Sequence, residues 1–176
     1  KQTSYYRITK NPYHYTRYNK GASGEYKIFA TLQGYEQSGG KFLFNLYLPR
    51  GVSKTTEIDL ILITHKGLFV FESKNFDGWI FGNEAHKNWT QSLPRRSGRS
   101  YKSSFYNPIK QNAAHIRHLR QITGYEIPVH SVIVFSDACT LKNVTVNGDD
   151  VRVVNMRSLS SIVGKIMDDA EARLTD

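Results

Sequence analysis

The sequence contains a single cysteine, Cys139, among 176 residues. No internal disulfide can form, and a zinc site built from several cysteines is excluded. A chain of this size without disulfide bridges is typical of a reducing compartment. Cys139 itself is expected to be a small buried hydrophobic side chain rather than a nucleophile.

Long apolar runs are missing as well. No stretch approaches the roughly 20 apolar residues that a membrane-spanning helix needs, and no secretory signal is visible. We therefore expect no internal membrane segment and a cytoplasmic location. Because the sequence starts at Lys1 rather than at methionine, this expectation stays compatible with an upstream anchor that tethers the chain to the inner face of a membrane.

Acidic residues are scarce in the first two thirds of the chain. Residues 1–120 hold 19 Lys/Arg and 7 Asp/Glu, whereas residues 121–176 hold 5 and 8, which together give the net charge of +9. This asymmetry favours nucleic acid as a partner of the first part, although a solvated basic surface would look the same. The acid-free stretch after residue 84 supplies the predicted phosphate contacts: Lys87, Arg95, Arg96, Arg99, Lys102, Lys110, Arg117 and Arg120.

Residues 1–22 also lack any acid and are rich in lysine, arginine and tyrosine. They form either an arm that stacks its aromatic rings on nucleic acid or a segment that packs its tyrosines on the remainder of the chain. We treat them as a separate segment, followed by one nuclease-like domain over residues 23–176. A hydrophobic share of 39% suits one core.

Periodicity predicts an α/β fold with a mixed central sheet flanked by helices. Helices are expected at residues 23–33, with Ser23 as N-cap and an end before Gly34, and at 108–123 and 159–170. Strands are expected at residues 42–48, 57–64, 68–74, 79–81, 128–135 and 151–154. Residues 83–106 are expected to be irregular, with a mobile loop at residues 97–100.

The strongest chemical pattern is Asp59, followed after twelve residues by Glu72-Ser73-Lys74. If His65 and Lys66 form the turn of a hairpin, Asp59 lies opposite Glu72. If the turn is Lys66-Gly67, Asp59 lies opposite Lys74. In both registers the three side chains share one face, because side chains alternate along a strand.

Two carboxylates facing each other on otherwise apolar strands repel, unless a cation lies between them. Carboxylate oxygens are the ligands that Mg²⁺ or Mn²⁺ prefers. Lys74 would reach the same place, where it could hold an attacking water or stabilise charge on a phosphate. The alternative is a structural ion pair with Lys74, since such a motif also occurs by chance.

The surroundings of this motif resemble the nuclease-related domain (NERD) family of the PD-(D/E)xK nuclease superfamily. The resemblance runs from about Gly24 to Leu119. It rests on ordered pieces at similar spacing: Gly24-Glu25, Ile58-Asp59, residues 67–75, Gly78-Trp79-Ile80, Trp89, and residues 107–112. One departure is Ile58, which stands where the superfamily has a proline.

This resemblance implies a restriction-endonuclease-like core and a role for each site residue. Asp59, Glu72 and the Ser73 carbonyl would bind the metal, and Lys74 would be the catalytic lysine. Glu25 would approach the metal, often through water; its alternative is a carboxylate that stabilises a helix N-terminus. Gln111 would line the active site; its alternative is an exposed helix residue.

The implied activity is Mg²⁺- or Mn²⁺-dependent hydrolysis of nucleic acid, with DNA expected before RNA. A module of the same fold that binds DNA without cutting it is the alternative, and an interaction domain with an accidental acid pair is more remote. We expect the Glu25 and Gln111 side chains within about 8 Å of the Glu72 carboxylate, the reach of a metal and one water. The oligomeric state stays open.

Other residues carry weaker expectations. His65 is expected to be exposed in the turn of the hairpin. His115 and His118 lack a neighbouring acid in the sequence, so we expect them on the surface of their helix. Trp79 and Trp89 are expected in the core.

Overall fold

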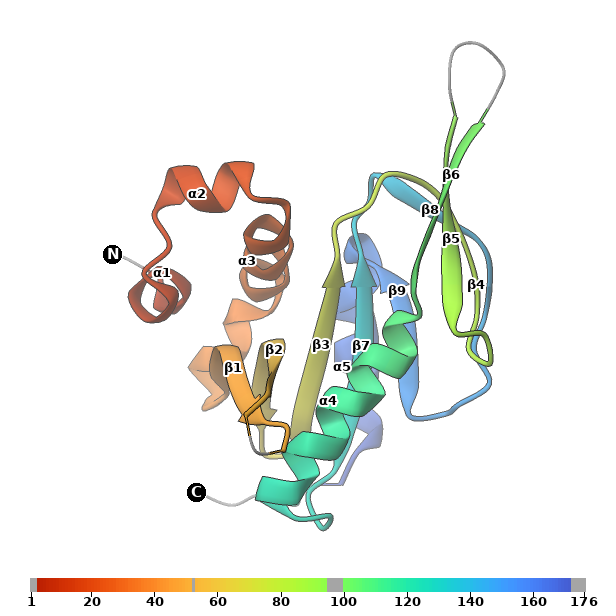
Figure 1. The fold of residues 1–176 in the computed structure, drawn as a ribbon. Helices are drawn as coiled ribbons and strands as arrows, with labels where there is room; N and C mark the ends of the chain where they lie inside the picture. The colour runs from red at the N-terminus through yellow and green to blue at the C-terminus, as the bar shows by residue number, and fades with distance from the viewer. Residues whose placement is uncertain (1–2, 52, 95–99, 172–176) are drawn as a thin grey trace.

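The computed structural model describes residues 3–51, 53–94 and 100–171 (Figure 1). Its centre is a five-stranded sheet in the order β1-β2-β3-β7-β9. These strands span Lys41–Pro49, Thr55–Thr64, Gly67–Lys74, Val129–Phe135 and Val151–Asn155. β1, β2 and β3 are antiparallel neighbours, whereas β7 runs parallel to β3 and β9 parallel to β7. The predicted α/β class with a mixed sheet is confirmed.

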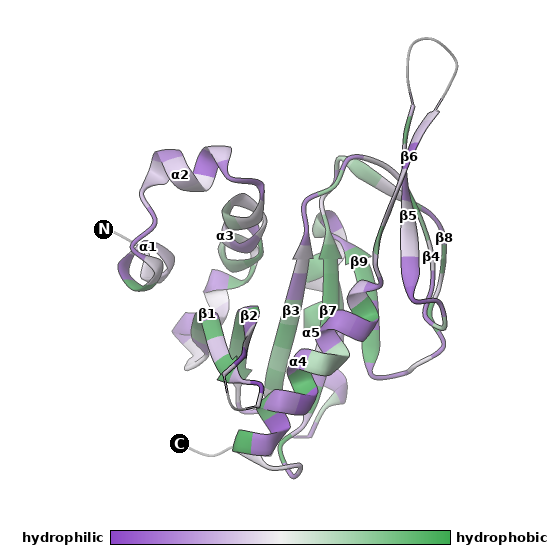
Figure 2. Cartoon of the chain, in the orientation of Figure 1, coloured by the Kyte–Doolittle hydropathy of each residue, from purple (hydrophilic) through white to green (hydrophobic). Residues whose placement is uncertain are grey.

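Helices cover both faces of this sheet. α3 (Lys20–Leu32) and α5 (Leu159–Asp169) pack on one face, and α4 (Pro108–Thr123) lies across the other (Figure 1). Two short 3-10 helices, Gln33–Ser38 and Met156–Ser158, follow α3 and precede α5. Figure 2 shows the central strands as mainly hydrophobic, as expected for strands buried on both faces. Across the described residues, no helix is long and apolar enough to cross a membrane.

The hairpin of β2 and β3 has the first of the two predicted registers. Thr64 pairs with Gly67 and Leu60 with Phe71, so His65 and Lys66 form a two-residue turn. The Thr64 hydroxyl donates a hydrogen bond to the Gly67 carbonyl. Gly67 has a φ of 126°, and an added side chain there would collide with the Pro128 carbonyl at 2.4 Å. Glycine is therefore required at the end of this turn.

Along β2, the apolar side chains at alternate positions before and after Asp59 pack on opposite faces of the central sheet. Leu60 packs in the core cluster beneath α3, whereas Ile58, two residues earlier, packs in the cluster beneath α4. The change accompanies Asn45 in neighbouring β1, which has a φ of 50°, a left-handed conformation that asparagine tolerates better than most residues. Asp59 lies between Ile58 and Leu60, so helices on both faces of the sheet can reach it.

A second sheet, in the order β6-β5-β4-β8, was not predicted. β4 (Gly78–Asn83) was expected, but β5 (Asn88–Pro94), β6 (Ser100–Tyr106) and β8 (Cys139–Thr145) were missed. The expectation that residues 83–106 are irregular is therefore wrong. β5 and β6 carry mostly polar side chains (Figure 2), so the apolar alternation that marks a strand is weak in them. The loop expected at residues 97–100 lies largely outside the described residues.

The N-terminal segment forms two short helices, α1 (Ser4–Thr9) and α2 (Tyr13–Tyr18). Tyr5 is fully buried, and its hydroxyl donates to the Ala22 carbonyl. The tyrosines of α2 (Tyr13, Tyr15 and Tyr18) are exposed, so the segment both packs on the core and presents rings to solvent. The expected helix start at Ser23 is wrong: α3 begins at Lys20, capped by the Asn19 side chain. The boundary expected after residue 22 falls inside this helix.

Candidate active site

Asp59 and Glu72 meet where β2 separates from β3. Leu60–Phe71 is the last regular pair of the hairpin, and beyond it the Ser73 backbone N–H donates to Oδ2 of Asp59 at 3.2 Å. The Asp59 side chain thus replaces the next backbone hydrogen bond between the strands. This interaction fixes one carboxylate oxygen beside the Glu72-Ser73-Lys74 segment.

Glu72 is a buried carboxylate, with only 2% of its surface exposed. Lys74 donates from Nζ to Oε1 of Glu72 at 2.6 Å and to Oε1 of Gln111 at 3.2 Å. Lys74 thus lies between an acid on its own strand and an amide on α4. The predicted convergence of Gln111 on the Glu72 carboxylate is confirmed, because one lysine nitrogen joins the two side chains.

His115 contacts the second carboxylate oxygen of Glu72. Its Nε2 lies 3.4 Å from Oε2 of Glu72, and its Nδ1 shares a hydrogen bond of 2.8 Å with the Thr56 hydroxyl. The histidine is 8% exposed, so the expectation of a surface residue without an acid nearby is wrong. His118, in contrast, is bonded to Gln121 at the exposed side of the helix. His115 follows Gln111 by four residues, which places both on one face of α4; this spacing was the overlooked signal.

Glu25 enters the site from α3. Burial, then Asp59 and Glu57, raise the pKa of Glu25 to about 7. Because α3 begins at Lys20, Glu25 lies beyond the first turn, and a role in stabilising the helix N-terminus loses its basis. Among the site residues, Asp59 is the one whose charge raises the pKa of Glu25. The expected distance of about 8 Å between the Glu25 and Glu72 carboxylates stays a prediction.

Close packing brings α3 over the site. A side-chain carbon added at Gly24 would lie 2.2 Å from Oγ of Ser73, so a larger residue there would have to displace the Ser73 hydroxyl. The Asn75 side chain also donates to the Lys20 carbonyl at 2.8 Å. The end of β3 is thus held against α3, next to Glu25.

Burial and the neighbouring Glu72 carboxylate raise the pKa of Asp59 to about 6. The Ser73 N–H, Lys74 and His115 lower the pKa of Asp59 in part, but they do not cancel these effects. A carboxylate with excess negative charge around it is a natural ligand for a cation.

The donor set fits a hard divalent cation. The described residues contain no group of three or more His, Cys, Asp or Glu side chains arranged to hold a metal. Mg²⁺, however, is usually held by one or two carboxylates, with water completing its octahedron. Asp59, Glu72 and the Ser73 carbonyl could supply such ligands, provided that Lys74 or His115 gives way at Glu72.

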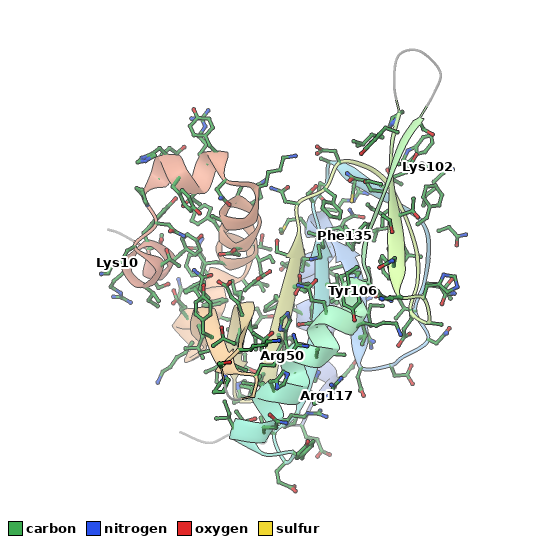
Figure 3. All side chains as sticks on the ribbon, viewed as in Figure 1. Lys10, Arg50, Lys102, Tyr106, Arg117 and Phe135 are labelled. Carbon is green, nitrogen blue, oxygen red and sulfur yellow. The ribbon has the colours of Figure 1, made fainter. Side chains whose placement is uncertain are left out.

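The predicted phosphate-contacting residues are spread over two elements. Lys87 and Lys102 are exposed, in the turn before β5 and on β6. Lys110, Arg117 and Arg120 lie on α4, and Figure 3 shows Arg117 well apart from Lys102. Arg120 packs over the Tyr125 ring. The remaining three predicted residues lie outside the described part of the chain: Arg95, Arg96 and Arg99.

The two tryptophans differ. Trp89 is 1% exposed, as predicted for a core residue. Trp79 is 41% exposed, so its assignment to the core is wrong. β4 places Trp79 on the outer face of the second sheet, whereas the neighbouring Ile80 is fully buried. His65 is exposed, as expected.

Comparison with known proteins covers the part of the chain that holds these residues. The family model described as "Nuclease-related domain" matches residues 20–136, a range that includes every residue of the cluster around Glu72. An uncharacterized protein of Bacillus anthracis is 33% identical over 149 residues, which cover 85% of this chain and 68% of that protein. The chain therefore belongs to the nuclease-related domain family.

Proposed function

We propose that this chain is a divalent-metal-dependent nuclease that hydrolyses phosphodiester bonds of DNA. The observation that carries the proposal is the meeting of Glu72, Lys74 and Gln111 from β3 and α4 through hydrogen bonds of 2.6 and 3.2 Å, next to Asp59 of β2. Two acids, a lysine and an amide in one partly buried place suit phosphodiester hydrolysis better than a structural ion pair, which would need only one acid and the lysine.

Asp59, Glu72 and the Ser73 carbonyl would hold Mg²⁺ or Mn²⁺. The chemistry such an ion supplies when bound is Lewis acidity toward the phosphate and a lowered pKa of a bound water. Asp59 is suited to this ligand role because its carboxylate lies in a partly buried place beside a second acid. Glu25, with a pKa of about 7, can accept or release a proton near neutral pH.

Lys74 has the role of stabilising charge on the phosphate. Its ammonium group donates hydrogen bonds to Glu72 and to Gln111. These two bonds would hold the lysine in place before the substrate arrives. A fixed cation in a partly dry site stabilises developing negative charge more than one in water does. If Lys74 were released from its hydrogen bond to Glu72, its ammonium group would be available to the substrate while Gln111 still holds it at the site.

His115 and Thr56 have a positioning role. The Thr56 hydroxyl fixes the imidazole at Nδ1, and Nε2 then faces Oε2 of Glu72. Such partners of a metal-binding carboxylate restrict its rotation, and their loss typically weakens metal binding or activity by about 10–100-fold. His115 thus belongs to the site through Glu72, not through contact with the substrate.

Phosphate contacts are proposed from the basic residues beside this site. Lys110 directly precedes Gln111 in the first turns of α4, and Arg117 is exposed two turns further on. Contacts of this kind are independent of base sequence and weaken with added salt. The proposal therefore includes salt-sensitive DNA binding that does not require Lys74.

The test is cleavage of circular and linear DNA by the purified protein in Mg²⁺, in Mn²⁺ and in EDTA. Wild type is expected to cut with either metal and not in EDTA. Asp59→Ala is expected to lose cleavage, whereas Glu36→Ala, at an exposed acid in the 3-10 helix after α3, is expected to keep it. DNA binding without cleavage by wild type would instead indicate a module that binds DNA only.

A further inference from the structure

The outer face of the second sheet has an unusual composition. Cross-strand registers place Lys102, Ser92, Trp79 and Thr140 in one row. The next row holds Ser104-Thr90-Phe81-Asn143, and beyond it lie the pairs Tyr106–Asn88 and Asn83–Thr145. The opposite face packs its apolar side chains, among them Ile80 and Trp89, in the third core cluster. Aromatic rings thus alternate with small polar side chains on a face whose residues are exposed or half-buried, except for the buried Ser92.

Three aromatic rings of this face lie in solvent or near it. Trp79 is 41% and Tyr106 is 48% exposed, and Phe81 is half-buried between them along the sheet. Figure 3 shows Tyr106 on β6 just before α4. Rows on one face of a strand repeat about every 6.6 Å, twice the rise per residue. Exposed aromatic rings at such a spacing are costly in water and suggest a partner.

The charged side chains on the four strands of this sheet are all lysines. The four strands contain no Asp or Glu. Lys102 lies in the row of Trp79, and Nζ of Lys142 lies 5.7 Å from the centre of the Trp79 ring. Glu84, in the turn after β4, faces away, because its carboxylate accepts the backbone N–H groups of Asn147 and Gly148. The face therefore complements a polyanion.

A cavity of about 290 Å³ opens beside Phe81 on this face. Its lining consists of Phe81 and Gly82, His86, and polar side chains from three strands: Asn83, Asn88, Thr90, Asn143 and Thr145. Within the described residues, Asn88, Thr90, Asn143 and Thr145 have no side-chain hydrogen bond. The volume lies at the lower end of the range of small-molecule sites, roughly 300–1,000 Å³, which suits one flat ring.

We infer that this face binds single-stranded nucleic acid, with one base in the cavity beside Phe81 and another stacked on Trp79. Rings stack on bases of any sequence, lysines contact the phosphates, and amide side chains can hydrogen-bond to the edge of an unpaired base. In a duplex the bases are stacked on one another, so their faces are not available to the rings. The inference deepens the proposed nuclease function, because it names unpaired strands as the substrate class.

Binding is tested apart from cleavage, in EDTA, by the fluorescence anisotropy of a labelled oligothymidine and of a duplex of the same length. Wild type is expected to bind the single strand more tightly. Phe81→Ala and Trp79→Ala are each expected to weaken single-strand binding roughly 5- to 150-fold, the loss of one stacked base. Trp79→Phe should restore most of the affinity. Tyr47→Ala, which removes an exposed ring from β1, outside this sheet, should change nothing.

Asn88→Asp provides a second variant that removes no packing, because Asn88 is exposed. The added negative charge in the cavity is expected to weaken single-strand binding severalfold. Lys142→Ala should lower the slope of log affinity against log salt by up to about 0.7 for the lost phosphate contact on a single strand. Thermal melts check that each variant is folded.

Three results would overturn the inference. The first is an unchanged affinity of folded Phe81→Ala and Asn88→Asp for oligothymidine. The second is equal binding of duplex and single strand, with equal losses in both. The third is binding to phosphatidylserine vesicles that depends on Trp79 when oligothymidine binding does not. Since no metal is present, failure of the nuclease proposal leaves these measurements unaffected: a protein that never cuts DNA can still pass or fail them.

Discussion

Nε2 of His115 lies 3.4 Å from Oε2 of Glu72, whose other oxygen accepts from Lys74 at 2.6 Å. A carboxylate that is 2% exposed thus has a different partner at each oxygen. Transferring a charge out of water is costly unless it is paired in this way. Metal binding at Glu72 must exchange one of these partners, which links the proposed metal site to the residues around it.

Replacement of His115 is the first prediction. His115→Ala should weaken Mn²⁺ binding, and cleavage at subsaturating metal, by about 10–100-fold, because Glu72 loses its orientation. Mn²⁺ affinity measured by isothermal titration checks this, and Thr56→Val should show a smaller effect of the same kind. His118→Ala is the matched control, since His118 lies on the same helix away from Glu72. Equal Mn²⁺ affinity of His115→Ala and wild type would remove His115 from the site.

Neutralising Asp59 should stabilise the metal-free protein. Burial, and then repulsion from Glu72, raise the pKa of Asp59. Asp59→Asn removes the charge on which both act, so its melting temperature in EDTA should exceed that of wild type. Millimolar Mn²⁺ should raise the melting temperature of wild type by mass action and leave Asp59→Asn nearly unchanged. Asp77→Asn, at an exposed acid, is the control. Identical melting of wild type in Mn²⁺ and EDTA counts against a metal site.

The stability of the metal-free protein should depend on pH through Asp59 and Glu25. Their folded-state pKa values, about 6 and about 7, lie above the ordinary values of 3.8 and 4.5 for these side chains. The folded state therefore binds these protons more tightly, and the stabilisation is complete below about pH 4 and lost as the pH rises through 6 and 7. For Asp59 the change is on the order of 3 kcal/mol.

Urea unfolding of wild type, Asp59→Asn and Glu25→Gln in EDTA at several pH values measures this dependence. Each variant should lose part of the decline in stability between about pH 4 and pH 7. His130, whose pKa is lowered mainly by burial, acts in the opposite direction but equally in all three proteins. If the three pH profiles are parallel, the carboxyl groups do not carry the dependence.

Lys74 should separate cutting from binding. Lys74→Ala removes the cation proposed to stabilise the phosphate, so cleavage should fall by at least about 10²-fold, while DNA affinity stays within a few fold of wild type. Joint replacement of Lys110 and Arg117 by alanine should do the reverse, with a salt slope on duplex lowered by up to about 0.9 for each lost contact. Anisotropy titrations at several salt concentrations measure both effects.

The parts of the site that depend on the turn and on neighbouring residues in the sequence could be predicted. A two-residue turn fixes the register of the hairpin, and alternation then fixes the common face of Asp59, Glu72 and Lys74. Asn107 and Pro108 mark the start of α4 correctly, since both are strong signals for a helix N-terminus. The position of Gln111 followed from the family resemblance rather than from the pattern of residues.

What could not be predicted depends on contacts between distant segments. His115 has no acid near it in the sequence, and only the packing of α4 on β3 brings it to Glu72. β5 and β6 lack a continuous apolar face, because one face of their sheet carries serine, threonine and asparagine. Trp79 was assigned to the core because tryptophan is usually well buried, whereas β4 places it outside.

The most direct measurement is the single-turnover rate of DNA cleavage in Mn²⁺ at saturating protein, for wild type, Asp59→Asn and Lys74→Ala. Saturation removes differences in DNA affinity, so the rate reports the site alone. The nuclease proposal predicts metal-dependent cleavage by wild type and a rate at least about 10²-fold lower for both variants. Cleavage by Asp59→Asn at the wild-type rate, or no cleavage by wild type of single- or double-stranded DNA in either metal, would contradict it.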